Sequence, residues 1–155
     1  MDALQSATTE FSKLLDLAAE QLPALTDTAT HIDAHIDGHW SRKQILGHLI
    51  DSAANNHQRF VRGQLAHELM TPNYAQREWV ETERFNDREW IDRVQFWLAY
   101  NRHLLHIMSH AAPDRLDSVI RIGENDPVSL EFVMIDYVSH MKHHLKQLGI
   151  RTAIE

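Results

Sequence analysis

Cysteine is absent from this chain of 155 residues. Disulfide bonds, thiolate metal ligands and a cysteine nucleophile are therefore all excluded, and any metal ion must be held by nitrogen or oxygen atoms. Glycine and proline are also scarce, with 5 and 4 residues respectively. Because few residues interrupt regular structure and the apolar positions recur at intervals of three and four, the sequence predicts an all-α protein.

Basic residues are also few: the chain has 15 lysines and arginines against 22 aspartates and glutamates, which gives a formal net charge of -7. A surface that binds the phosphates of nucleic acid normally gathers Lys and Arg, so we expect no nucleic-acid partner. The segment from Met1 to Leu22 has neither a basic leader nor a long apolar run. It predicts neither a signal peptide nor a membrane span, and we expect a cytoplasmic protein without a membrane partner.

The apolar periodicity predicts four long helices within one domain, residues 1–155. They run from about Thr8 or earlier to about Leu22, from Ser41 to about Leu65, from Asn86 to about Ala111, and from near Ser129 to Gly149. Ser41 with Gln44, and Asn86 with Glu89, have the spacing of capping boxes, and Gly149 suits a left-handed C-terminal cap. Four such helices most simply pack as a four-helix bundle, in which metal sites are built from inward-projecting side chains.

The segments between the long helices are less regular. We expect a polar connection up to Trp40, and a loop from Thr71 to Phe85 with a short helix around Gln76 to Val80. Val119 to Ile122 lead into a Gly-Glu-Asn-Asp-Pro turn. This pattern predicts a short extended excursion or hairpin before the last helix.

Histidines on two of the predicted helices suggest a metal centre. His140 and His144 lie four residues apart and therefore one turn apart on the same face of the last helix. On a helical wheel they flank its apolar stripe, whereas His143 faces away from it. His48 lies on the second long helix and could supply a third imidazole if the two helices are neighbours. Because the glutamate of an HExxH motif is absent, a hydrogen-bonded pair of interfacial histidines stays open as an alternative.

A polar row accompanies His48 along one edge of its helix. Ser52, Asn55 and Arg59 follow it and could line a pocket, or could form an ordinary solvated face. The planar fork of Arg59 suits a carboxylate. Asp136, one turn before His140, could orient the second nitrogen of that imidazole, or could be a solvated acid favoured by the helix dipole.

Two other histidine clusters are weaker candidates. His103, His106 and His110 project away from the apolar side of their helix, so we expect them to be exposed. His31, His35 and His39 are also spaced by four, but Asp37-Gly38 interrupts them. Asn101, in contrast, projects toward the apolar side of the third long helix. A polar group there requires a hydrogen-bond partner.

Trp40-Ser41, His48 within ILGHLIDSA, and His140 and His144 within SHMKHHLKQL together resemble the DinB/YfiT-like superfamily over nearly the whole chain. The resemblance implies a four-helix bundle with a divalent metal held by one histidine of the second helix and two of the last. Those roles fall on His48, His140 and His144. It also implies a homodimer, since relatives are often dimeric, and some relatives are thiol-dependent transferases or isomerases.

Three neutral imidazoles leave a coordination position open, which is typical of a catalytic site. We therefore expect a metal-dependent enzyme that acts on a small molecule, either a hydrolase or an S-transferase using a low-molecular-weight thiol. In a chain without cysteine, the reacting sulfur would come from outside. Zn or Ni suits an all-imidazole set, and Fe, Co or Mn are also compatible. The alternative is a non-catalytic metal-binding or dimerising scaffold.

Overall fold

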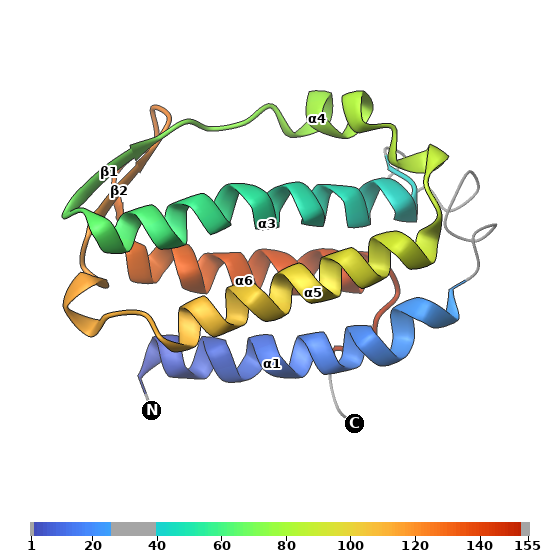
Figure 1. Cartoon of the computed structure of the whole chain (residues 1–155), viewed down its shortest axis with the longest axis horizontal. Helices are drawn as coiled ribbons and strands as arrows, with labels where there is room; N and C mark the ends of the chain where they lie inside the picture. Colours follow the sequence, from blue (N-terminus) through green and yellow to red (C-terminus); the bar gives the residue numbers. More distant parts are fainter. Residues whose placement is uncertain (1, 26–39, 153–155) are drawn as a thin grey trace.

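Four long helices lie side by side in the computed structural model of the chain, which describes residues 2–25 and 40–152 (Figure 1). They are α1 (Ala3–Gln21), α3 (Arg42–Leu65), α5 (Trp90–Ser109) and α6 (Leu130–Gln147). Helices α1 and α3 each pack against both α5 and α6. The predicted all-α four-helix bundle is confirmed, and α3 and α6, which carry the three candidate histidines, are neighbours.

The start of α3 and the end of α6 have the capping residues that the sequence predicts, and Ser129 caps the start of α6. Ser41 Oγ accepts a hydrogen bond from the Gln44 amide at 3.2 Å, and Gln44 Oε1 accepts one from the Ser41 amide at 2.9 Å. Both halves of the capping box are thus present. Ser129 Oγ accepts from the Phe132 amide at 3.0 Å, and α6 is followed by Gly149 with a φ of +89°. This left-handed conformation favours glycine.

The predicted start of α5 is wrong. The helix begins at Trp90 rather than Asn86, and Asn86 lies in a short 3₁₀ helix, η2 (Phe85–Asp87). Its Oδ1 accepts a hydrogen bond from Ser41 Oγ at 2.5 Å. The side chain that would have capped α5 is therefore engaged at the start of α3. Arg84, with a φ of 53°, turns the chain before this 3₁₀ helix.

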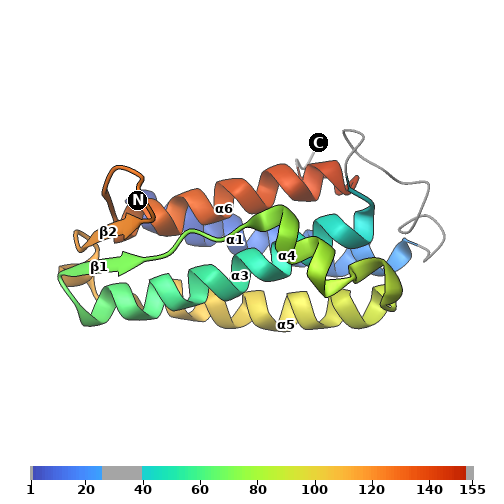
Figure 2. The ribbon, with the colours of Figure 1, turned by 90° about the horizontal axis from the view of Figure 1, so that it is seen from above.

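The shorter elements lie at the edge and one end of the bundle. The predicted short helix is α4 (Gln76–Glu83), and the predicted hairpin is formed by β2 (Val119–Ile122) and β3 (Val128–Ser129). The sequence did not indicate β1 (Glu68–Thr71), which pairs in parallel with β2. Figure 2 shows this sheet at one end of the bundle and the segment from β1 to α4 running along α3. The 3₁₀ helices η1 (Leu22–Ala24) and η3 (Pro113–Arg115) complete the described elements.

The core follows the apolar stripes of the four long helices. The apolar stripe of α6 and its C-terminal cap is buried throughout: Leu130, Val133, Met134, Tyr137, Met141, Leu145 and Leu148. Asn101 is fully buried as well, and it accepts a hydrogen bond from the Tyr137 hydroxyl at 2.5 Å and donates one to the Trp97 carbonyl at 2.9 Å. The partner that a buried amide requires is therefore present. None of the described helices is both long and apolar enough to cross a membrane.

Candidate metal centre

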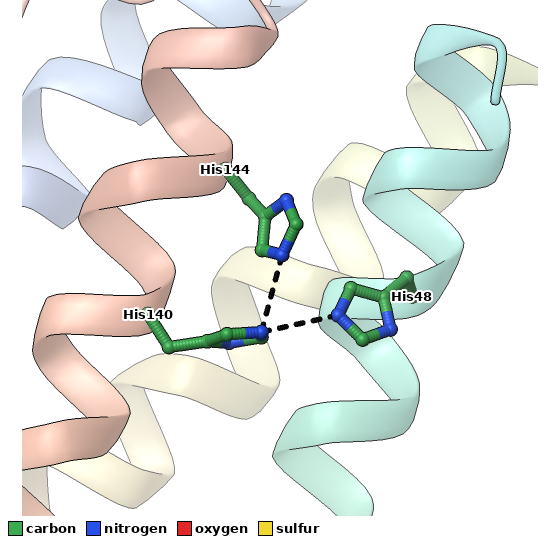
Figure 3. A group of neighbouring side chains, drawn as sticks. All are labelled: His48, His140 and His144. Carbon is green, nitrogen blue, oxygen red and sulfur yellow. Dashed lines mark hydrogen bonds between the residues drawn. The ribbon is translucent and has the colours of Figure 1, made fainter. Parts of the chain in front are cut away.

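Three imidazoles converge between α3 and α6 (Figure 3). His48 comes from the second turn of α3, and His140 and His144 come from successive turns of α6. The Nε2 atom of His140 lies 3.2 Å from His48 Nε2 and 3.1 Å from His144 Nε2. The ligand atoms of all three rings lie within 4.8 Å of one another. The packing of α3 against α6 thus brings together residues that are 92 positions apart in the chain.

The spacing and chemistry of the three nitrogens fit a divalent metal ion. Zn–N bonds of about 2.0–2.1 Å in a tetrahedral site place neighbouring nitrogens about 3.3 Å apart. His144 Nδ1 lies 2.7 Å from Gln147 Oε1, an acceptor, so Nδ1 carries the proton. In the neutral ring, His144 Nε2 then presents a lone pair to the other imidazoles. A divalent cation between the rings could accept this lone pair together with those of His48 Nε2 and His140 Nε2.

The surroundings keep these imidazoles neutral. Burial lowers the pKa of His48 to about 3, with a further contribution from the charges of His140 and His144. Burial likewise lowers the pKa of His140 to about 4, helped by His144 and His143. The pKa of His144 is also lowered, mainly by burial. Protons therefore compete little with a metal for these nitrogens near neutral pH.

The Nδ1 atoms, which face away from the other imidazoles, differ in their hydrogen bonding. Gln147 fixes His144, whereas His48 Nδ1 is buried without a hydrogen-bond partner among the described residues. The Trp40 ring lies against the His48 ring, with centroids 5.1 Å apart. Asp136 is exposed, and no hydrogen bond joins it to His140 in the part of the chain that the structure describes. Its role in orienting that imidazole stays a prediction.

A cavity of about 150 Å³ lies beside the three histidines, with His140 in its wall. The polar side chains around it come from α3, from the segment before α4 and the first residue of α4, and from α6: Ser52, Asn56, Arg59, Asn73, Tyr74, Gln76, Asp136, Tyr137 and His140. A ligand in the cavity can thus reach the metal centre from one side. This access is typical of a catalytic rather than a closed structural site.

The structure corrects the polar row that the sequence placed on α3. Ser52 and Arg59 are only 3% and 7% exposed, so the solvated-face interpretation is wrong for them. Asn55 does not line the cavity, and its side chain donates to the Asp51 carbonyl at 2.9 Å. Asn56 lines the cavity instead, because residues 52, 56 and 59 share one face of a helix.

Asp51 and Tyr74 are polar residues near this site that were not predicted from the sequence. Asp51 is 2% exposed, and its pKa is raised to about 8 by burial, then by a hydrogen bond with Glu83 and the charge of that residue. Burial and the charge of Asp51 raise the pKa of Tyr74 to about 12. The signal for Asp51 was an acid inside the apolar run Ile45 to Ala53. Only the position of α4 reveals its carboxyl partner.

The competing histidine clusters have different outcomes. His103, His106 and His110 are exposed, as predicted. His31, His35 and His39 lie outside the described residues. Within residues 2–25 and 40–152, only His48, His140 and His144 form a group of three or more His, Asp or Glu side chains placed closely enough for one ion.

Comparison with known proteins supports the fold. No protein-family model and no curated protein matches the chain. A solved structure, that of YfiT from Bacillus subtilis, superposes with a TM-score of 0.78 and 17% sequence identity over 94% of this chain and 83% of that one. It is described as "a probable metal-dependent hydrolase with an unusual four-helix bundle topology". At this identity the likeness establishes a shared fold, which confirms the architecture that the sequence resemblance implied.

Proposed function

We propose that this protein is a divalent-metal-dependent enzyme that acts on a small molecule, with hydrolysis as its reaction class. The observation that carries the proposal is the convergence of three neutral imidazoles, one of which, His140, lies in the wall of an accessible cavity. A site that served only to tie helices together would need no such access.

His48, His140 and His144 would hold the ion through their Nε2 atoms, and Gln147 would keep His144 in the tautomer that presents this nitrogen. A bound divalent ion supplies Lewis acidity, which polarises a substrate oxygen or lowers the pKa of a water or thiol that it contacts. Zn or Ni suits an all-imidazole set, and Fe, Co or Mn are compatible with it.

Tyr74 would assist as a hydrogen-bond donor. It lies in the cavity wall, and its pKa, raised to about 12 by burial and by the charge of Asp51, keeps the phenol protonated at neutral pH. A protonated hydroxyl can donate to an oxygen on which negative charge develops during hydrolysis. The likeness of fold to a protein described as a probable metal-dependent hydrolase is consistent with this reaction class.

The first test is metal content, measured by elemental analysis on untagged protein. We expect about one divalent ion per chain in the wild type and a loss of most of it in His144→Ala, because two imidazoles hold a metal far less tightly than three. His106→Ala is the matched control, since this exposed histidine lies on α5 away from the site. Full metal content in the His144 variant would contradict the ligand set.

The second test is hydrolysis of a panel of small esters, amides and phosphoesters by metal-loaded wild type and His144→Ala, with and without added thiols. Metal-dependent hydrolysis without thiol supports the proposal. Turnover only with a thiol would replace it by S-transfer. If chelation unfolds the bundle and no turnover is found, the ion is a structural tie and the scaffold alternative is correct.

A further inference from the structure

Arg59 is a buried cation in the wall of the cavity beside the metal centre. Its side chain comes from α3, and the residue is 7% exposed. Removing a charge from water is costly, so buried guanidinium groups normally have a carboxylate partner and a full set of hydrogen bonds. Arg59 has neither.

The contacts of the guanidinium are few and long. Nη1 lies 3.5 Å from Asn56 Oδ1 and Nη2 lies 3.4 Å from the Pro72 carbonyl, both neutral acceptors beyond the usual 2.7–3.2 Å range. Nε is buried without a hydrogen-bond partner among the described residues. None of the three guanidinium nitrogens of Arg59 therefore makes a hydrogen bond of normal length, although the group lies in the wall of a cavity.

In the part of the chain that the structure describes, no aspartate or glutamate forms an ion pair with Arg59. Asp136 lines the same cavity, but it is exposed to solvent and lies beyond ion-pair distance. Asp51 is engaged with Glu83. The positive charge inside the cavity is thus available to a ligand.

We infer that Arg59 is the anchor of a carboxylate subsite, and that the substrate is an elongated molecule with a carboxylate at one end and its reacting group at the other. The position of the reacting end rests on the proposed function, because that end would face His48, His140 and His144. The carboxylate end rests on Arg59 and its cavity alone.

The separation of His48 and Arg59 along α3 limits the length of such a substrate. Arg59 follows His48 by 59 − 48 = 11 residues, which is about 16 Å along α3. Side chains on a helix lean toward its N-terminus, so the guanidinium is closer to the metal centre than its Cα atom is. A cavity of about 150 Å³ is the size that holds a ring of benzene dimensions. It therefore accepts a short unbranched or cyclic acid.

The charge of the subsite favours a carboxylate over a phosphate. Among the described residues that line the cavity, Arg59 is the only lysine or arginine, and Asp136 adds a negative charge at the rim. One planar guanidinium matches the two oxygens of a carboxylate, whereas a phosphate dianion would require further positive charge. The chain's excess of acidic residues makes that additional charge scarcer still.

The first experiment uses metal-free protein, so that it does not depend on the metal centre. Hexanoate and hexan-1-ol are titrated by calorimetry, and the Arg59 Nε–H resonance is followed by NMR. We expect hexanoate to bind about tenfold or more tightly than the alcohol and to shift this resonance, because a charge-assisted bidentate pair forms only with the acid. Arg59→Gln should remove the preference, and Arg59→Lys should retain only part of it.

The second experiment uses zinc-loaded protein with 6-mercaptohexanoate and 6-mercaptohexanol, which differ only at the anionic end. If both proposals hold, His144→Ala weakens binding of both thiols, whereas Arg59→Gln weakens only that of the acid. If the metal centre is wrong but the subsite is correct, the hexanoate preference in metal-free protein persists.

Three outcomes would overturn the subsite. Equal binding of hexanoate and hexan-1-ol by folded wild-type protein is the first. A preference that appears only in Asp136→Asn is the second, since it would mean that Asp136 already serves as the counter-ion of Arg59. Binding of hexyl phosphate about tenfold more tightly than hexanoate is the third. Circular dichroism of each variant verifies folding, and the Lys variant keeps the test decisive if the Gln variant unfolds.

Discussion

Gln147 is the residue that assigns a tautomer to the candidate metal centre, since its Oε1 accepts the Nδ1 proton of His144 at 2.7 Å. Replacing it with alanine removes this hydrogen bond and lets the imidazole rotate or change tautomer. We expect Gln147→Ala to weaken zinc affinity by about 10- to 100-fold, the usual effect of losing such a partner. Competition with a chelating dye measures the affinity, and the exposed neighbour Lys146→Ala is the control. Unchanged affinity in the Gln147 variant would show that His144 needs no such support.

Asp51 makes the stability of the fold depend on pH in an unusual direction. Burial, with the hydrogen bond and charge of Glu83, raises the pKa of Asp51 from 3.8 to about 8 in the folded state. The folded state therefore binds more protons than the unfolded state between about pH 4 and pH 8, so this residue's contribution to the free energy of unfolding falls as the pH rises through that window.

We accordingly expect Asp51→Asn to be more stable than the wild type at pH 8, by about 1 kcal/mol or more, because the amide has no proton to lose. The gain should shrink toward pH 4. Urea unfolding at several pH values measures it, with the exposed helical residue Asp16→Asn as control. If Asp51→Asn instead loses stability relative to the wild type as the pH rises to 8, Asp51 is ionised in the folded protein and the prediction is wrong.

For individual residues, the sequence predicts which side chains share one face of a helix. It does not predict contacts that a side chain makes with another element. His140, His144 and the buried stripe of α6 follow from the period of a single helix. The environment of Asp51 depends on Glu83 of α4, and that of Arg59 on the Pro72 carbonyl. Such partners are separated by loops whose path is not encoded by a repeating pattern.

Among the elements, α3 is positioned by the close approach of the Phe85 ring to Gly47, the residue that precedes His48. A Cβ atom at Gly47 would lie 2.0 Å from Phe85 Cδ2, so only glycine fits. Phe85 is 5% exposed, and its ring is held in the core. This contact joins the start of α3 to η2 and the segment that leads into α5.

We expect Gly47→Ala to lower the free energy of unfolding by about 1–3 kcal/mol, the usual cost of overpacking a core. Combined with Phe85→Ala, it should cost less than the sum of the two single changes, because the smaller side chain leaves room for the new methyl group. Urea unfolding of the four proteins measures the coupling. Additive effects would show that Gly47 and Phe85 are energetically independent.

Elements defined by local signals were predicted, whereas those defined by distant partners were not. The capping box of Ser41, the turn between β2 and β3, and Gly149 are local, and each is present. The start of α5 was misplaced because Asn86 bonds Ser41 rather than its own helix. Strand β1 was missed because its partner strand, β2, lies about fifty residues later, with Glu68 opposite Val119.

For the whole molecule, the decisive fact is that α3 and α6 are neighbours in the bundle. Helical periodicity identifies inward faces but does not say which helices meet, so the convergence of His48 with His140 and His144 was conditional until the fold was known. The resemblance to the DinB/YfiT-like superfamily supplied the arrangement, and the likeness to the YfiT structure supports it at the level of fold. The expected homodimer and cytoplasmic location stay predictions.

X-ray absorption spectroscopy of the zinc-loaded wild-type protein tests the central claim most directly, because it reports the atoms around the ion. We predict three imidazole nitrogens at about 2.0 Å and at least one further light atom that is replaced by sulfur when 6-mercaptohexanol is added. Fewer than three imidazoles in the spectrum, or a shell of protein ligands that the thiol leaves unchanged, would contradict an accessible metal centre built from His48, His140 and His144.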